Sequence, residues 1–203
     1  MRFQVKQCTV ELHYLFFAVI AFFLFTDTTG TALLGLAATI LHEGGHFLVI
    51  LWYAGTVKAV RFHAFGVDVE EVKRAKRGYA IDVLVSLAGP LANLVGGLFC
   101  ALLYFYWQSP VLQEFIVVNG TLAAFHLLPV ETLDGGQALY ALLCCRYTPK
   151  IAANIVAVVS FLVLLPTAVL GFFLLLQSRY NFTLFFISIY LMILLVLKRG
   201  RFF

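Results

Sequence analysis

Charged residues are scarce in this sequence, and their scarcity limits the class of protein it can encode. Only 12% of the 203 residues are Asp, Glu, Lys or Arg, whereas 63% are hydrophobic. A water-soluble domain of this length needs more polar surface, so the composition predicts a polytopic membrane protein. The net charge is only +4, and the basic residues gather in short loops and at the C-terminus. Binding to nucleic acid is therefore not expected.

Three further patterns are missing. The cysteines Cys8, Cys100, Cys144 and Cys145 have no C-x-x-C spacing, which argues against a disulfide framework and against a thiolate zinc site. No small-x-small cleavage signal follows the first apolar run, so we expect a retained membrane span and no removable signal peptide. Internal repeats and low-complexity linkers are lacking as well. We therefore expect a single membrane domain over residues 1–203.

Apolar runs dominate what is present, and their lengths predict an all-α polytopic membrane protein with six transmembrane helices. Between the second and third runs, residues 57–69 partly alternate apolar and polar side chains around Gly66. Such alternation predicts a short hairpin at the membrane face. The six spans are expected at residues 10–25, 31–54, 79–107, 111–128, 151–176 and 182–197.

The positions of the basic residues predict how these spans are oriented. With a cytoplasmic N-terminus, six spans place the basic loop 58–77, the loop 146–150 and the basic tail 198–201 on the cytoplasmic side. The outer connections then contain only Arg179 among basic residues, as the positive-inside rule requires. We therefore expect both termini in the cytoplasm.

The motif His42-Glu43-Gly44-Gly45-His46 lies inside the second run. A helix brings residues i and i+4 to one face, so both imidazoles can bind one metal ion, for which zinc is the prime candidate. Glu43 stands beside them, where a carboxylate can take a proton from the attacking water. A chance match would leave an uncompensated carboxylate in the membrane, at a cost of about 2.5–3.5 kcal/mol.

Two glycines inside this motif call for a reason, because each lowers helix stability by about 1 kcal/mol. Close approach of water or substrate to Gly44 and Gly45 would explain them, and tight packing against another helix would explain them equally well.

Catalytic zinc sites commonly use three protein ligands, so a third ligand is needed. Asp134 follows the fourth span and is flanked by Gly135 and Gly136. It could bind the metal, or it could serve as the N-cap of a short helix that begins near Gln137. The residues alone leave these two roles open.

Taken together, the motifs resemble those of the site-2 protease family. HExxH in one span, AGPxxN around Asn93 in the next, and LDGG around Asp134 follow one another in the order of that family. The resemblance covers about residues 32–139, the three-helix core of these intramembrane zinc metalloproteases. Six spans without an inserted PDZ domain look most like the sporulation-type branch.

The resemblance implies a role for each matching residue. His42, His46 and Asp134 would bind one zinc ion, and Glu43 would be the general base. Asn93 would support the site. Two positions depart from the family pattern, because His126 stands where an Asn is usual and Thr132 where Pro is frequent.

His126 has three possible roles: a fourth metal ligand, a packing residue, or a hydrogen-bond donor that replaces the family Asn at the oxyanion. The donor role is the one we expect, because a fourth protein ligand would close the site.

The implied function is hydrolysis of a peptide bond in or near a transmembrane segment of a membrane-tethered substrate. Cleavage would release a cytoplasmic fragment such as a transcription factor, from an active site that opens to the cytoplasm. A bacterial cell membrane is the expected location, and the partners are the lipid bilayer and a transmembrane protein substrate. The alternatives are a non-catalytic membrane relative that binds metal or partners, and a metal transporter.

Overall fold

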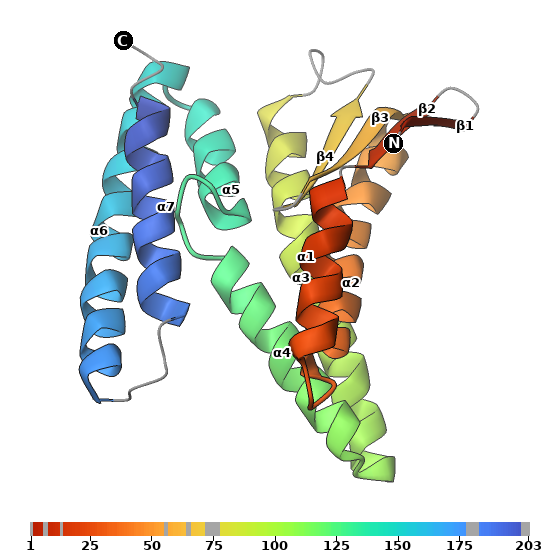
Figure 1. Cartoon of the computed structure of the whole chain (residues 1–203). Coiled ribbons are helices and arrows are strands. Elements are labelled where there is room, and N and C mark those ends of the chain that lie inside the picture. Colours follow the sequence, from red (N-terminus) through yellow and green to blue (C-terminus); the bar gives the residue numbers. More distant parts are fainter. Residues whose placement is uncertain are drawn as a thin grey trace. The chain divides into compact units, whose positions relative to one another are not determined.

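The computed structural model describes residues 2–5, 8–12, 14–54, 57–63, 66–71, 78–177 and 183–199 (Figure 1). The chain divides into two compact units, which are described separately. The first unit comprises Met1–Gly78 and Leu87–Phe125, and the second comprises Tyr79–Ser86 and His126–Phe203. Part of the basic loop, residues 72–77, lies outside the described residues, as do Arg179 and Arg201.

The first unit contains a four-stranded sheet in the order β1-β2-β3-β4. β3 and β4 are antiparallel and form the hairpin that the alternation in residues 57–69 predicts. β2 and β3 are parallel, and the crossover that a parallel pair needs is made by helices α1 (Tyr14–Thr26) and α2 (Thr31–Ala54). The strands are β1 (Arg2–Val5), β2 (Cys8–Leu12), β3 (Val57–His63) and β4 (Gly66–Glu71).

The N-terminal strands correct the expectation of a helical span from residue 10. Val10 lies in β2 and pairs with Phe3 and Val60, and helix α1 (Tyr14–Thr26) begins only afterwards. The physical reason is local, because β-branched Thr9 and Val10 favour a strand and precede the polar Glu11. With 13 residues, α1 is about 20 Å long, shorter than the roughly 30 Å hydrocarbon core.

Helix α2 (Thr31–Ala54) begins at a tight turn. Gly30 adopts a φ of 85°, a conformation that side chains disfavour. The Asp27 carboxylate accepts hydrogen bonds from the Thr29 hydroxyl (2.7 Å) and from the backbone N–H groups of Thr29 (2.9 Å) and Ala32 (2.8 Å). These bonds, led by the Thr29 hydroxyl, hold the pKa of Asp27 below its usual value.

Helix α3 (Tyr79–Trp107) passes through Pro90 and contributes its first turns to the second unit. It ends at Gln108, which has a φ of 39° and donates its N–H to Tyr104 O. Helix α4 (Pro110–His126) then starts with a proline, which suits a first helical position.

Besides the first turns of α3, the second unit contains α5 (Asp134–Cys144), α6 (Pro149–Gln177) and α7 (Thr183–Arg199), together with the loop before α5. Buried Ser160 of α6 fixes this loop, because its Oγ accepts the Glu131 N–H at 2.8 Å and donates to Val156 O at 2.7 Å. The loop that leads to Asp134 is therefore tied to a long helix.

In the part of the chain that the structure describes, three helices are long and apolar enough to cross a membrane. α4 and α7 have 17 residues each, at the short end of the range for a crossing. The structure is thus mainly helical with a small sheet, and the length and composition of its helices agree with a membrane protein, whereas the number of six crossings stays a prediction. The three spans are Thr31–Tyr53, Tyr79–Trp107 and Pro149–Phe173.

Candidate metal centre

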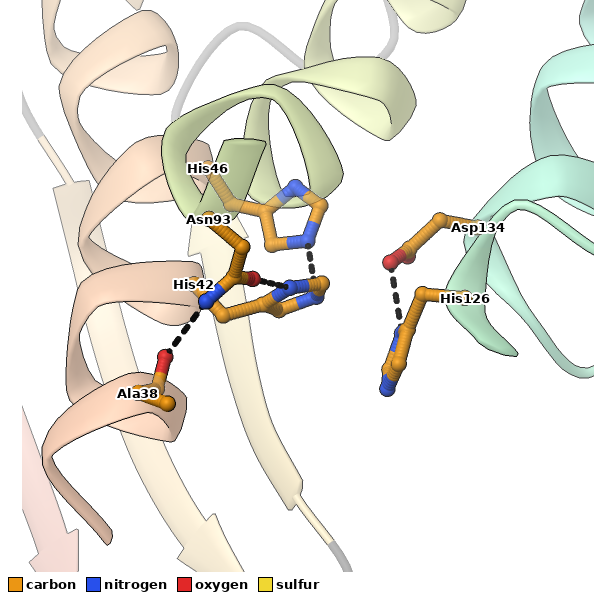
Figure 2. A network of polar contacts seen from close by, with 6 residues as sticks. All are labelled: Ala38, His42, His46, Asn93, His126 and Asp134. Carbon is orange, nitrogen blue, oxygen red and sulfur yellow. Dashed lines mark hydrogen bonds and ion pairs between the residues drawn. The ribbon is translucent and has the colours of Figure 1, made fainter. Parts of the chain in front are cut away.

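Helix α2 presents His42 and His46 on one face, with their Nε2 atoms 3.2 Å apart (Figure 2). Two nitrogens that each lie 2.0–2.1 Å from a tetrahedral zinc ion are about 3.3 Å apart. The two rings therefore have the separation of a pair of ligands on one zinc ion. Only 2% of the His42 surface is exposed, and His46 is half-buried.

The His42 ring is held from behind by Asn93 of α3. The Nδ1 atom of His42 lies 2.6 Å from Asn93 Oδ1, and Asn93 is fully buried (Figure 2). An amide oxygen only accepts hydrogen bonds, so His42 donates its Nδ1–H and leaves the Nε2 lone pair for a metal. Asn93 is thus placed to support the site by fixing the orientation of the His42 ring.

Glu43 follows His42 by about 100° around the helix axis. Its side chain is half-buried, which suits a base that must reach water. Gly44 lies a further 100° around, and a Cβ atom there would meet nothing within 4 Å. A Cβ atom on Gly45 would lie 2.5 Å from Ala88 O and 2.7 Å from Ala92 Cβ, so tight packing of α2 against α3 explains Gly45.

Gly89 brings the α3 backbone against both imidazoles. A Cβ atom there would collide with His46 Nε2 and lie 2.7 Å from His42 Nε2. The small-residue segment Ala88-Gly89-Pro90 therefore lets a helix backbone approach the two candidate ligand atoms.

In the second unit, His126 and Asp134 form a pair of their own, with His126 Nδ1 2.8 Å from Asp134 Oδ2 (Figure 2). Their side chains are 26% and 14% exposed. His126 ends α4, and Asp134 is the first residue of α5 with Leu133 at the N-cap position. Asp134 is therefore not the N-cap of this helix, and that alternative is wrong.

The two glycines after Asp134 are required by packing within the same unit. A Cβ atom on Gly135 would collide with Leu127 O, and one on Gly136 would collide with Val130 O. The first turn of α5 thus packs directly against the preceding loop. This contact fixes the position of the backbone that carries the Asp134 side chain.

The contact with Asp134 changes the interpretation of His126. A carboxylate only accepts hydrogen bonds, so His126 donates its Nδ1–H to Asp134, and that N–H is not available to an oxyanion. The geometry favours a role in holding the Asp134 carboxylate, as outer hydrogen-bond partners of metal ligands do.

Sequence reasoning missed Asn119 of α4, which is fully buried and hydrogen-bonded to Asn93. A signal was present, because an amide in an apolar membrane helix needs a partner. The partner could not be identified from the sequence, since Asn93 lies 26 residues away on another helix.

Known proteins with similar sequences include metalloproteases. A protein named zinc metalloprotease from Methanocaldococcus jannaschii is 26% identical over 179 residues, which cover 80% of this chain and 52% of that protein. Stage IV sporulation protein FB from Bacillus subtilis is 25% identical over 141 residues, 66% of this chain and 47% of that protein. The chain thus spans about half the length of these curated relatives. No family model matches it.

A solved structure shows the same fold. The site-2 protease from Methanocaldococcus jannaschii superimposes with a TM-score of 0.61 and 21% identity, covering 94% of this chain and 91% of that one. The chain therefore has the fold of a site-2 protease. The shared fold and the sequence relatives support the site-2 protease family, which is the family that the motifs indicate.

Proposed function

We propose that this chain is an intramembrane zinc metalloprotease that hydrolyses a peptide bond in or near a transmembrane segment of a membrane-tethered substrate. The observation that carries the proposal is the 3.2 Å separation of two Nε2 atoms on one helix, with a glutamate between the two histidines in sequence. Sequence relatives that are named zinc metalloproteases support it.

We propose that His42, His46 and Asp134 hold one zinc ion per chain. Two imidazole nitrogens and a carboxylate oxygen match the donor set of catalytic zinc sites in other metalloproteases. A zinc ion bound there would polarise the scissile carbonyl and make water a stronger nucleophile near neutral pH.

The residues of the chain perform the proton transfers. The Glu43 carboxylate accepts a proton from the attacking water and then delivers it to the nitrogen of the leaving amine. Asn93 keeps the His42 ring in one orientation throughout, and His126 does the same for Asp134. A helical substrate must first unwind locally, because its carbonyl groups are otherwise hydrogen-bonded within the helix.

The unwound substrate needs a hydrogen-bonding partner, and β4 offers one. Among the described strands, β1 and β4 are the edges of the sheet, and β4, which pairs only with β3, also contacts α2, the helix that bears His42 and His46. An extended substrate segment that adds to this edge would have its backbone groups satisfied while a peptide bond is exposed for attack.

Asp134→Ala is expected to lose both cleavage and zinc, because it removes a ligand. His126→Leu is expected to weaken zinc binding by about 10–100-fold, because it removes the N–H that orients the carboxylate. Zinc affinity is measured by competition with a chelator, and cleavage is measured on single-pass test proteins in detergent. Asp82→Ala on α3 is the control for the loss of a half-buried Asp.

Zinc retained at the parent affinity in Asp134→Ala would exclude Asp134 as a ligand. Zinc without cleavage of any test protein by the parent chain would indicate a binding relative, and metal flux into vesicles would indicate a transporter.

We also propose six membrane crossings with both termini in the cytoplasm of a bacterial cell. The short helices α1, α4 and α7 would supply the three additional crossings, and α1, at about 20 Å, would require local thinning of the bilayer. Single cysteines placed at residue 1 and residue 203 of a cysteine-free variant are expected to resist an impermeant thiol reagent in intact cells and to react after lysis. Labelling of either terminus from outside would contradict this topology.

A further inference from the structure

A chain of buried amide groups leads away from His42 through three helices. Asn93 of α3 and Asn119 of α4 are both fully buried, and neither belongs to the proposed ligand set. Buried amides in apolar surroundings must be hydrogen-bonded, and here the partners are one another, two backbone carbonyls and the imidazole. The role inferred below rests on the proposed function of His42 as a metal ligand.

The donor and the acceptor of each hydrogen bond between these amide groups can be assigned. The carbonyl oxygen of Phe115 only accepts, so the Asn119 atom that lies 2.9 Å from it is the Nδ2 donor. The Oδ1 atom of Asn119 therefore faces Asn93, whose Nδ2 donates to it at 2.8 Å. The second Nδ2 hydrogen of Asn93 goes to Ala38 O at 2.9 Å.

Both hydrogens of the Asn93 amide are thus occupied, and its Oδ1 must face His42. A rotated amide would place Oδ1 of Asn93 against two other oxygens, those of Ala38 and Asn119. The oxygen of Asn93 accepts the Nδ1–H of His42, so His42 is locked in the tautomer whose Nε2 atom can bind a metal.

We infer that Asn119 is a positioning residue for the metal centre. It acts through Asn93, which fixes the tautomer of His42. Without Asn119, the Asn93 amide keeps only Ala38 O to oppose rotation. A rotated amide donates to Nδ1 of His42, moves the ring proton to Nε2, and removes the lone pair that a metal needs. A neutral amide relay also avoids a further carboxylate inside the membrane, in addition to those of Glu43 and Asp134.

Two substitutions at one position separate this role from simple packing. Asn119→Leu fills a similar volume and offers no oxygen to Asn93. Asn119→Asp, as the neutral acid, keeps an oxygen that accepts from Asn93 Nδ2 and an O–H that can donate to Phe115 O, so it is the conservative variant expected to rescue. Gly120→Ala is the matched control on the same helix, because a Cβ atom there would meet nothing within 4 Å.

The first measurement needs no metal. Nuclear magnetic resonance of metal-free protein with labelled histidine ring nitrogens reports which nitrogen carries the proton, and a His42→Asn sample assigns the His42 signals. We expect His42 to be protonated at Nδ1 in the parent and in Asn119→Asp, and to shift toward protonation at Nε2 in Asn119→Leu. The second measurement is zinc affinity, expected to fall by about 10–100-fold in Asn119→Leu alone.

An Nε2-protonated His42 in the parent would overturn the inference, as would an unchanged tautomer and unchanged zinc affinity in Asn119→Leu. If Asn119→Leu does not fold, as judged by circular dichroism, Asn119→Ala takes its place with the same expected shift. A tautomer shift as expected in a chain that binds no zinc would leave the relay intact and refute the proposed function instead.

Discussion

Glu43→Gln is expected to abolish peptide-bond cleavage while the chain still binds one zinc ion. The substitution keeps the size of the side chain and leaves both imidazoles of α2 untouched, including the 3.2 Å separation of their Nε2 atoms. An amide cannot accept the proton from the attacking water, and loss of a general base typically lowers a rate by about 10²–10⁴-fold. In this variant, cleavage should therefore be lost while the zinc content stays at one ion per chain.

Cleavage is measured on single-pass test proteins that the parent chain cuts, and zinc is measured on the purified protein by elemental analysis. Glu114→Gln is the matched control, because Glu114 is a half-buried glutamate of α4 whose Oε1 accepts a hydrogen bond from the Thr31 hydroxyl. An amide oxygen can accept the same bond, so the control should cleave like the parent. Cleavage by Glu43→Gln at the rate of the parent would refute the mechanism.

The helices and the hairpin could be predicted because their signals are local. The long apolar runs correspond to α2, α3 and α6, and the alternation in residues 57–69 corresponds to β3 and β4. The N-terminal strands could not be placed with the same ease, since β2 pairs with β3 across a gap of about 50 residues. From the sequence alone, Val10 is assigned to the apolar run that follows it, because its pairing with Val60 of β3 is not visible there.

The residues of the candidate site follow the same rule. His42 and His46 are four residues apart, so helix geometry alone brings them to one face. Asn119 could not be assigned, because its contact with Asn93 depends on how two helices pack. The tautomer of the His126 ring also needed the structure, since only its contact with Asp134 shows where its N–H is used.

The glycines show which small residues of the sequence are structural requirements. Gly44 and Gly45 are indistinguishable in sequence, yet only Gly45 packs against the backbone of α3. Gly89 is a stronger case, because its neighbours are the ring nitrogens themselves. It lies on a helix turn that the Asn93 hydrogen bond to His42 holds in place.

Gly89→Ala is therefore expected to remove zinc binding from a chain that still folds. The added Cβ atom would collide with His46 Nε2 and lie 2.7 Å from His42 Nε2, whereas ordinary contacts of a Cβ atom are 3.4 Å or more. The His42 ring cannot turn away without breaking its 2.6 Å contact with Asn93. We expect a loss of zinc affinity greater than the roughly 10–100-fold that follows loss of an outer partner.

Gly97→Ala is the control for this substitution, since Gly97 is also buried on α3 and a Cβ atom there would lie 3.5 Å from Asn119 Cβ, an ordinary contact. Replacing either glycine by alanine favours the helix by up to about 1 kcal/mol, so a difference between the two variants cannot come from helix propensity. Chelator competition measures zinc affinity, and thermal unfolding followed by circular dichroism measures stability. Parent-like zinc affinity in Gly89→Ala would mean that the two Nε2 atoms do not face α3 in the metal-bound chain.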